Sequence, residues 1–293
     1  HGCAFLFEAS VGGGTPIITP MHQCLAANVI SEVEGIVNGT TNFMLTKMVR
    51  EGLGFEDALQ IAQELGYAET KDPSDDVDGR DACRKIAILS SMVCGHQIYP
   101  QNIPTRGIRA ISTADVEAAE KLGCVIKLIA WMKRGKDGSV AAGVEPCLVP
   151  KANQLASVDD VFNAVLVKGD MLGDVVFYGK GAGELPTASA CVADVIECLQ
   201  EERHRPEIGW SADTGGFASP LTLKNRWYFR VGTDTLPEAL HSAKVLEQGT
   251  ETAFITPPIT GTDAERLAAY LKPRFAGAKQ EKALLLSLDS RSR

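Results

Sequence analysis

Residues 125–149, with the sequence VIKLIAWMKRGKDGSVAAGVEPCLV, decide the fold. The runs 125–132 and 139–149 are apolar and of strand length. Between them, Lys133 to Gly138 form a polar stretch with two glycines, which is typical of a hairpin connection. We therefore expect two neighbouring strands in the middle of the chain.

The sequence before and after this hairpin predicts further strands and helices. Short apolar runs predict strands, and apolar residues at helical spacing predict helices. Strands are expected at 3–8, 32–37, 163–168 and 174–178. Helices are expected after Pro16 and over 43–52, 55–65, 81–95, 114–122 and 184–200. This mixture predicts an α+β fold for residues 1–205, with a mixed β-sheet and helices on one face.

The last third of the chain predicts a separate, smaller unit. Residues 206–225 are rich in Gly, Pro and Ser and predict a linker. Residues 226–293 then alternate between strand-like and helix-like runs. Strands are expected at 227–231, 252–256 and 283–288, and helices at 236–248 and 263–271. This alternation predicts a small α+β domain.

Composition excludes several classes of protein. Apolar residues make up 45% of the chain and charged residues 23%, which is ordinary for a globular protein. The net charge of −8 disfavours nucleic-acid and anionic-membrane partners, and no run of 18 apolar residues predicts a membrane span. The eight cysteines are scattered without a CxxC pair, and the chain starts without a signal-peptide pattern. We therefore expect free thiols and a cytoplasmic location.

Four charged residues near one helix start are candidates for a binding or catalytic site. Asp81 and Lys85 are four residues apart on the helix expected over 81–95, so their side chains share one face. Glu69 and Asp76 come from the acidic loop before it. Three carboxylates and one ammonium group suit a small zwitterion, since the lysine can exchange a proton with an oxygen. A solvated acidic helix start with one surface ion pair explains the same pattern.

Longer blocks of sequence favour a binding site over a solvated helix start, because they resemble a known family. Residues 66–89, GYAETKDPSDDVDGRDACRKIAIL, resemble the signature segment of homoserine dehydrogenases. Three further blocks are similar to the same family and come in its order: EASVGGGTPII at 8–18, NGTTNFML at 38–45 and VFNAVLVKGDMLGDVVFYGKGAGELPTA at 161–188. The resemblance covers about residues 3–200. It implies interconversion of L-homoserine and L-aspartate 4-semialdehyde with NAD(P), in threonine and methionine synthesis.

The resemblance also implies a role for each residue of the acidic block. Lys85 corresponds to the proton-transfer residue, and Glu69 and Asp81 correspond to the groups that hold the substrate amino group. Asp76 is implied as a supporting carboxylate. The chain departs from the family here, because Thr70–Asp75 is one residue longer than in most members.

Glycine-rich segments carry two further implications of the resemblance. The carboxylate of Glu8 and the backbone carbonyls of Val11, Gly13 and Thr15 match a site for a monovalent cation, sodium. Oxygen ligands from a tight turn suit a hard cation, although such a turn also needs glycine for its own conformation.

Two more glycines, Gly66 and Gly183, match positions that approach the dinucleotide. Glycine permits such an approach, but a plain loop-to-helix turn uses it too. Residues 38–41 are implied to face the nicotinamide side of the cleft.

A strand followed by GxGxxG and a helix, the usual dinucleotide-binding pattern, is missing from the sequence. In the resembled family this domain precedes the block at 8–18, so we expect a fragment that is inactive alone. The resemblance further implies a homodimer formed through the sheet and an ACT-like domain over 226–293, which is one strand short of the usual βαββαβ order. Alternatives are a related amino-acid dehydrogenase and a non-catalytic amino-acid-sensing or dimerisation module.

Overall fold

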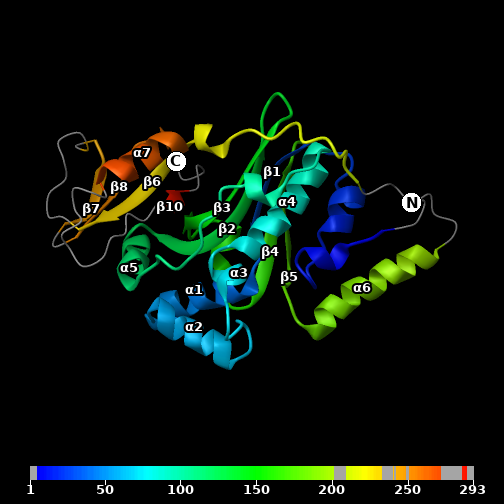
Figure 1. Ribbon diagram of the computed structural model, residues 1–293, viewed down its shortest axis with the longest axis horizontal. Coiled ribbons are helices and arrows are strands. Elements are labelled where there is room, and N and C mark those ends of the chain that lie inside the picture. Colours follow the sequence, from blue (N-terminus) through cyan, green and yellow to red (C-terminus); the bar gives the residue numbers. More distant parts are fainter. Residues whose placement is uncertain are drawn as a thin grey trace.

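A single β-sheet runs through the molecule (Figure 1). The computed structural model describes residues 5–200, 209–232, 240, 242–248, 251–271 and the backbone of 286–288. The strand order is β5-β4-β1-β2-β3-β10-β6-β8-β7, with β9 paired to β6. The strands are β1 (Ile30–Ile36), β2 (Cys124–Arg134), β3 (Val140–Pro150), β4 (Phe162–Gly169), β5 (Gly173–Lys180), β6 (Lys224–Val231), β7 (Lys244–Gln248), β8 (Thr252–Ile255), β9 (Ile259–Thr260) and β10 (Leu286–Leu288).

The predicted hairpin is confirmed as β2 and β3, which pair antiparallel from Cys124↔Pro150 to Arg134↔Val140. Its turn is closed by the Gly135 N–H, which donates to the Ser139 carbonyl at 2.7 Å. Strands β1, β4 and β5 extend the sheet on the β2 side, all antiparallel. The confirmed α+β class is mixed in its sheet because β3 and β10 pair in parallel.

Helices from the first half of the chain cover one face of this sheet (Figure 1). Their apolar side chains form the main core with the inward residues of β1–β4, including Met44, Ile86, Ile126 and Val165. The opposite face carries a smaller cluster around Ile36, Trp131 and Leu166. The helices are α1 (Gly39–Glu51), α2 (Phe55–Glu64), α3 (Ser74–Val77), α4 (Arg80–Cys94), α5 (Thr113–Lys121), α6 (Glu184–Leu199) and α7 (Gly261–Leu271). Of these, α7 packs on the other face of β6, against Trp227 and Phe229, and α6 contributes no buried residue.

The C-terminal segment is joined to the rest by the sheet and by a buried charge network. Asp115 at the start of α5 is fully buried. It accepts hydrogen bonds from Arg230 Nε at 2.8 Å and from the Tyr228 hydroxyl at 3.0 Å. Burial raises the pKa of Tyr228, so its hydroxyl remains a donor. Strands from before and after residues 206–225 pair in one sheet. The division of the chain into two domains at this segment stays a prediction.

Two sequence predictions of secondary structure are wrong. Residues 244–248, expected in a helix, form β7, which pairs with β8. The C-terminal segment therefore contains the strand that the sequence analysis did not find. Residues 233–239, which include the start of the predicted helix, lie outside the described part of the structure. The strand expected at 3–8 is absent over its described residues 5–8, and Glu8–Ser10 form a 3-10 turn instead.

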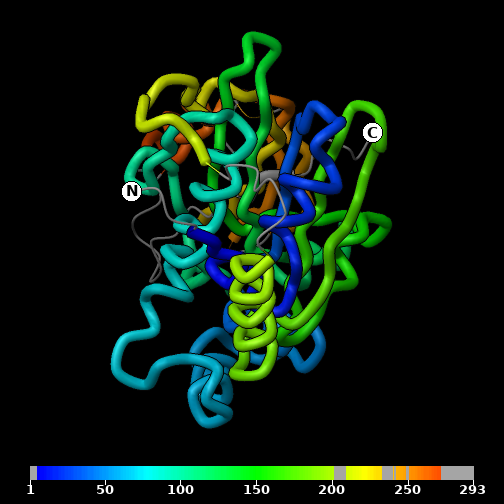
Figure 2. The backbone as a smooth tube through the Cα atoms, turned by 90° about the vertical axis from the view of Figure 1, so that its right-hand side faces the viewer, coloured from blue at the N-terminus to red at the C-terminus, as the bar shows by residue number. Residues whose placement is uncertain are grey.

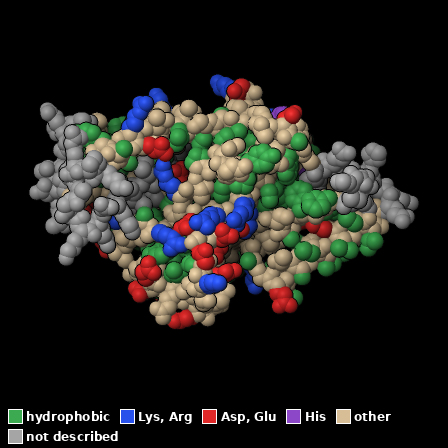
Figure 3. Space-filling view, in the orientation of Figure 1, with side chains coloured by type: hydrophobic (Ala, Val, Ile, Leu, Met, Phe, Trp, Pro, Cys, Tyr) green, Lys and Arg blue, Asp and Glu red, His purple; other side chains and the backbone are tan. Residues whose placement is uncertain are grey.

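Helix α6 lies at the edge of the molecule in Figure 1, and it faces the viewer in Figure 2. None of its residues is buried, although its sequence is apolar. Leu185 is 80% exposed and Leu199 74%, and Figure 3 shows hydrophobic side chains gathered along this helix. Within the described residues, no helix is long and apolar enough to cross a membrane.

Candidate active site

Three helices meet beside the carboxyl end of β1. Asn38 is the N-cap of α1, α3 carries Asp76, and α4 carries Asp81 and Lys85 one turn apart. Gly79 connects α3 to α4 with a φ of +80°, a value that glycine adopts readily. An added Cβ there would lie 3.2 Å from Val144 Cγ1 on β3, so this turn is packed closely onto the sheet.

The Lys85 ammonium group is held at this meeting point. Its Nζ lies 2.8 Å from Asp81 Oδ2 and donates to the carbonyl of Val37 at 2.9 Å. Its side chain is 17% exposed. An ammonium group has three N–H donors, and these are its partners among the described residues, so one donor remains for a ligand.

Asn38 links the two aspartates, a feature that sequence reasoning missed. Its Nδ2 donates to Asp76 Oδ1 at 2.7 Å and to Asp81 Oδ2 at 3.0 Å. Burial is the largest influence on Asp76 and raises the pKa of its carboxyl, and the nearby Asp81 charge acts in the same direction. The predicted trio of Asp76, Asp81 and Lys85 is therefore brought together in one place.

Glu69 is not part of this contact network. Its side chain is exposed, and its carboxylate has no hydrogen-bond or ion-pair partner in the described part of the chain. The loop that carries it is nevertheless tied to the start of α1, because the Thr40 hydroxyl donates to the Tyr67 carbonyl at 2.6 Å. The ring of Tyr67 also packs edge-on against Phe43, with 5.0 Å between centroids.

The two predicted cofactor glycines lie on separate segments. Gly66 follows α2 with a φ of +75°, and the Tyr67 N–H donates to the Ala62 carbonyl at 2.8 Å. This geometry ends the helix. Gly183 precedes α6 with a φ of +117°. An added Cβ at Gly66 would meet no atom within 4 Å, so open space lies beside it.

The Glu8 carboxylate binds the backbone of the next segment. Its Oε1 accepts from the N–H groups of Ile17 at 2.6 Å and Ile18 at 2.9 Å, and its Oε2 accepts from Thr19 at 2.7 Å. These bonds explain why Glu8 lies in a 3-10 turn and not in the predicted strand. They also satisfy the free donors ahead of the π-helical turn Pro20–Cys24.

Replacing Glu8 with glutamine is expected to lower the free energy of unfolding by about 1–3 kcal/mol, because an amide nitrogen would face the Thr19 donor and leave it unsatisfied. Chemical denaturation measures this change. The matched control is Glu117→Gln on the exposed side of α5, which we expect to alter stability by less than about 0.5 kcal/mol. Equal stability of the two variants would contradict the assigned role of Glu8.

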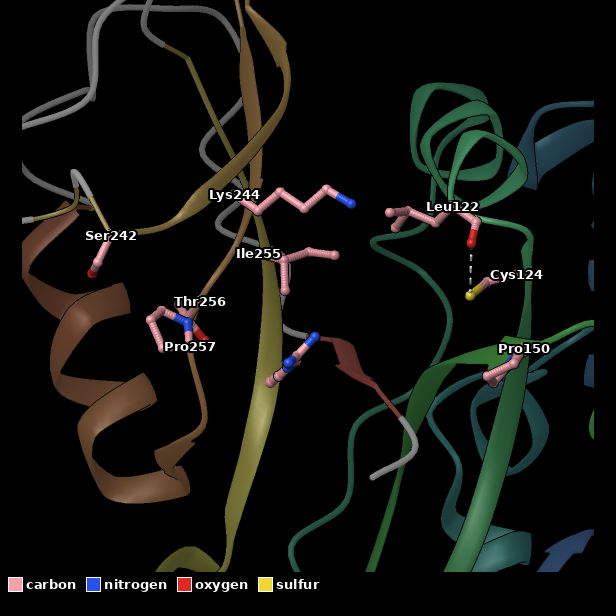
Figure 4. Close-up of a pocket in the computed structure, with 9 residues that line it drawn as sticks. Leu122, Cys124, Pro150, Ser242, Lys244, Ile255, Thr256 and Pro257 are labelled. Atoms are coloured by element: carbon pink, nitrogen blue, oxygen red, sulfur yellow. Dashed lines mark hydrogen bonds between the residues drawn. The ribbon is translucent and has the colours of Figure 1, made fainter. Parts of the chain in front are cut away.

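A cavity of about 320 Å³ lies elsewhere, between the start of β2 and the C-terminal strands (Figure 4). Lys244 reaches from β7 toward Leu122, whose carbonyl accepts from Cys124 Sγ at 3.7 Å. None of the predicted site residues lines this cavity.

Comparison with known proteins decides the family. The homoserine dehydrogenase family model matches residues 16–196. The chain belongs to the homoserine dehydrogenase family. A homoserine dehydrogenase of Synechocystis is 51% identical over 202 residues, which are 68% of this chain and 46% of that protein. One of Lactococcus lactis is 41% identical over 237 residues, 80% of this chain and 55% of that protein. The chain thus spans about half the length of these relatives.

Solved structures of the family share the fold. A homoserine dehydrogenase from Thiobacillus denitrificans superposes with a TM-score of 0.85 at 32% identity, over 97% of this chain and 69% of that chain. A hyperthermophilic archaeal homoserine dehydrogenase in complex with NADPH matches with a TM-score of 0.57 at 31% identity, over 69% of this chain and 57% of that chain. The family assignment and the α+β class predicted from the sequence are confirmed.

Proposed function

We propose that this chain supplies the substrate-binding and proton-transfer groups of a homoserine dehydrogenase that interconverts L-homoserine and L-aspartate 4-semialdehyde. The observation that carries the proposal is the Lys85 ammonium, held between Asp81 Oδ2 and the Val37 carbonyl with one donor left over. The pathway implied is threonine and methionine synthesis.

The carboxylates suit the ammonium end of the substrate. Asp81 contacts the Lys85 tip, and it shares a donor in Asn38 with Asp76. Two carboxylates this close favour a bound cation, because each lowers the energy of a positive charge between them. Glu69 is exposed and without a partner among the described residues, so it is free to complete this contact when substrate binds.

Lys85 moves a proton at the substrate oxygen. In the oxidative direction its unprotonated amine takes the proton of the homoserine hydroxyl, and the oxygen becomes the carbonyl oxygen of the semialdehyde. In the reductive direction the ammonium returns that proton to the same oxygen. When bound, NAD(P) accepts or supplies the hydride at the hydroxyl-bearing carbon. Asp81 holds the Lys85 ammonium in place through their ion pair.

Gly66 and Gly183 are the residues that we propose to lie beside the cofactor. Gly66 and Gly183 offer backbone without a side chain, and open space lies beside Gly66. No strand–GxGxxG–helix unit occurs in the sequence, so a further dinucleotide-binding domain is needed. We propose that this domain covers α6, whose exposed Leu185, Val195 and Leu199 are an apolar surface that water disfavours. On this basis the chain alone binds substrate without turnover.

A sodium ion is proposed at the turn after Glu8. The carbonyl oxygens of Val11, Gly13 and Thr15 accept no hydrogen bond from the described residues, and the buried Thr15 hydroxyl has no partner. Glu8 has one remaining lone pair beside its three backbone bonds. These oxygens fit a hard monovalent cation. A higher melting temperature in sodium chloride than in choline chloride is the expected sign, and it should vanish in Glu8→Gln.

A homodimer in a reducing compartment completes the proposal. Strand β5 is the edge of the sheet, and the hairpin that it forms with β4 exposes Met171, Leu172 and Tyr178. Exposed apolar side chains on a sheet edge suit a second copy of the chain. The cysteines in the described part of the chain are free thiols, which suits the cytoplasm.

The test of the proposed function is a comparison of ligands by calorimetry, followed by an assay. L-homoserine should bind this chain more tightly than L-2-aminobutyrate, which lacks the hydroxyl. Joining a dinucleotide-binding domain should then give NAD(P)-dependent oxidation of L-homoserine. Preference for another amino acid would favour a related dehydrogenase. Absence of activity after the domain is restored would favour a non-catalytic sensing or dimerisation module.

Acidification is expected to weaken L-homoserine binding at a pH above the ordinary aspartate value of 3.8. The pKa of Asp76 is raised, so its carboxylate takes up a proton early and loses its attraction for the substrate ammonium. The same shift has a stability consequence: its contribution is present at low pH and is lost as pH rises through the raised pKa. Asp76→Asn should therefore bind weakly at every pH and be more stable than the parent at neutral pH without ligand. Titrations between pH 4 and pH 8 measure the affinity for L-homoserine and the stability. If binding to Asp76→Asn depended on pH as binding to the parent does, the prediction would be contradicted.

A further inference from the structure

The orientation of the Asn38 amide is fixed by its neighbours. Its Oδ1 accepts from the Thr41 backbone N–H at 2.9 Å and from the Thr41 hydroxyl at 2.9 Å. A backbone N–H is a donor only, so the oxygen of the amide must face it. The amide nitrogen therefore faces the other way, and the residue is 6% exposed.

In this orientation, the amide nitrogen of Asn38 contacts two carboxylates. Its two N–H donors are used by Asp76 Oδ1 at 2.7 Å and Asp81 Oδ2 at 3.0 Å. The same Asp81 oxygen lies 2.8 Å from Lys85 Nζ. One neutral side chain thus holds two like charges together and aligns the oxygen that the lysine contacts.

We propose that Asn38 is a positioning residue of the reaction: its amide keeps Asp76 and Asp81 adjacent for the substrate ammonium and holds Asp81 within reach of Lys85. The proposal rests on the proposed function. It adds a residue that acts through the carboxylates and does not itself touch the reacting oxygen.

The competing explanation is helix capping alone. Asn38 is the N-cap of α1, and its Oδ1 performs that task through Thr41. Serine and aspartate cap helices about as well as asparagine, but neither offers two N–H donors. Asn38→Ser and Asn38→Asp therefore keep the cap and remove the bridge, which separates the two roles.

Kinetics of the complete enzyme give the first readout. Asn38→Ser should remain folded with a modestly lower melting temperature, and its kcat/KM for L-homoserine should fall by about 10–100-fold, the effect of losing hydrogen bonds to charged groups. Asn38→Asp places a third carboxyl beside Asp76 and Asp81, and it regains a donor only when protonated. Its KM should therefore improve on acidification, which is opposite to the parent. Parent-like kcat/KM in a stably folded Asn38→Ser overturns the proposal.

A carboxyl ¹³C NMR titration of the ligand-free chain gives a second readout, which does not depend on the substrate. The charged groups that face Asp76 are Asp81 and Lys85 on α4, whereas α1 contributes the uncharged Asn38 and Thr40. Loss of the Asn38 donor should move the Asp76 titration to higher pH in Asn38→Ser. An unmoved titration overturns the proposal even if that variant folds poorly enough to complicate its kinetics.

The two readouts also separate this proposal from the proposed function. Failure of the parent enzyme to bind or oxidise L-homoserine removes the proposed function, and the NMR titration still decides whether Asn38 sets the carboxylate pair. Normal homoserine activity with parent-like Asn38→Ser in both readouts removes only the positioning role.

Discussion

Replacing Lys85 with methionine is expected to lower kcat for L-homoserine by about 10²–10⁴-fold in an enzyme that combines this chain with a dinucleotide-binding domain. Methionine fills a similar volume but has no proton to exchange with the substrate oxygen. The KM should change much less than kcat, because Asp76 and Asp81 still face the substrate ammonium. Steady-state measurement of nicotinamide absorbance in both directions gives these values.

Two companion variants define the cause of this loss. Lys85→Arg keeps a positive charge beside Asp81, but a guanidinium does not give up a proton at physiological pH, so kcat should remain low. Lys71→Met removes an exposed lysine from the neighbouring loop and should leave kcat unchanged. A Lys85→Met enzyme within about threefold of the parent would contradict general acid–base catalysis by this residue.

Replacing Arg230 with methionine is expected to lower the free energy of unfolding by about 3–5 kcal/mol, since the change leaves the fully buried Asp115 charge without its cationic partner. The loss should be measured by urea denaturation. It should appear together with loss of the contacts between α5 and β6, because Asp115 begins α5 and Arg230 lies on β6.

Arg226 on the same strand is the matched control for Arg230. It is exposed and makes no ion pair with the described residues, so Arg226→Met should cost less than about 0.5 kcal/mol. Equal stability of the two methionine variants would show that the buried network does not join the C-terminal segment to the catalytic sheet.

Local sequence patterns predicted the elements that depend on their own residues. The hairpin at 125–149 was predictable because strand-length apolar runs flank a glycine-containing turn. The pairing of Asp81 with Lys85 followed from helical spacing, and the structure gives 2.8 Å between their charged atoms. Both features are set within a few residues of the chain.

Features that depend on distant partners were missed. The run 236–248 has helical spacing, yet its residues 244–248 form a strand because β8 provides hydrogen bonds to them. The apolar stretch 5–8 resembles a strand, but Glu8 turns toward the backbone N–H groups of Ile17, Ile18 and Thr19. Neither partner is visible in a window of local sequence.

The candidate site shows the same division. Asp76, Asp81 and Lys85 were predictable because they lie within ten residues of one another. Asn38 was not, because its bonds to Asp76 and Asp81 span 38 and 43 residues. Its position at a helix start was the available signal, and this signal indicates a cap without indicating what the other end of the amide contacts.

A crystal structure of this chain with L-homoserine tests the central claim most directly. We expect the substrate hydroxyl oxygen within about 3.2 Å of Lys85 Nζ, a hydrogen-bond distance, and the substrate ammonium against Asp81 and Asp76. Homoserine bound on another surface, or bound with its hydroxyl turned away from Lys85, would contradict it.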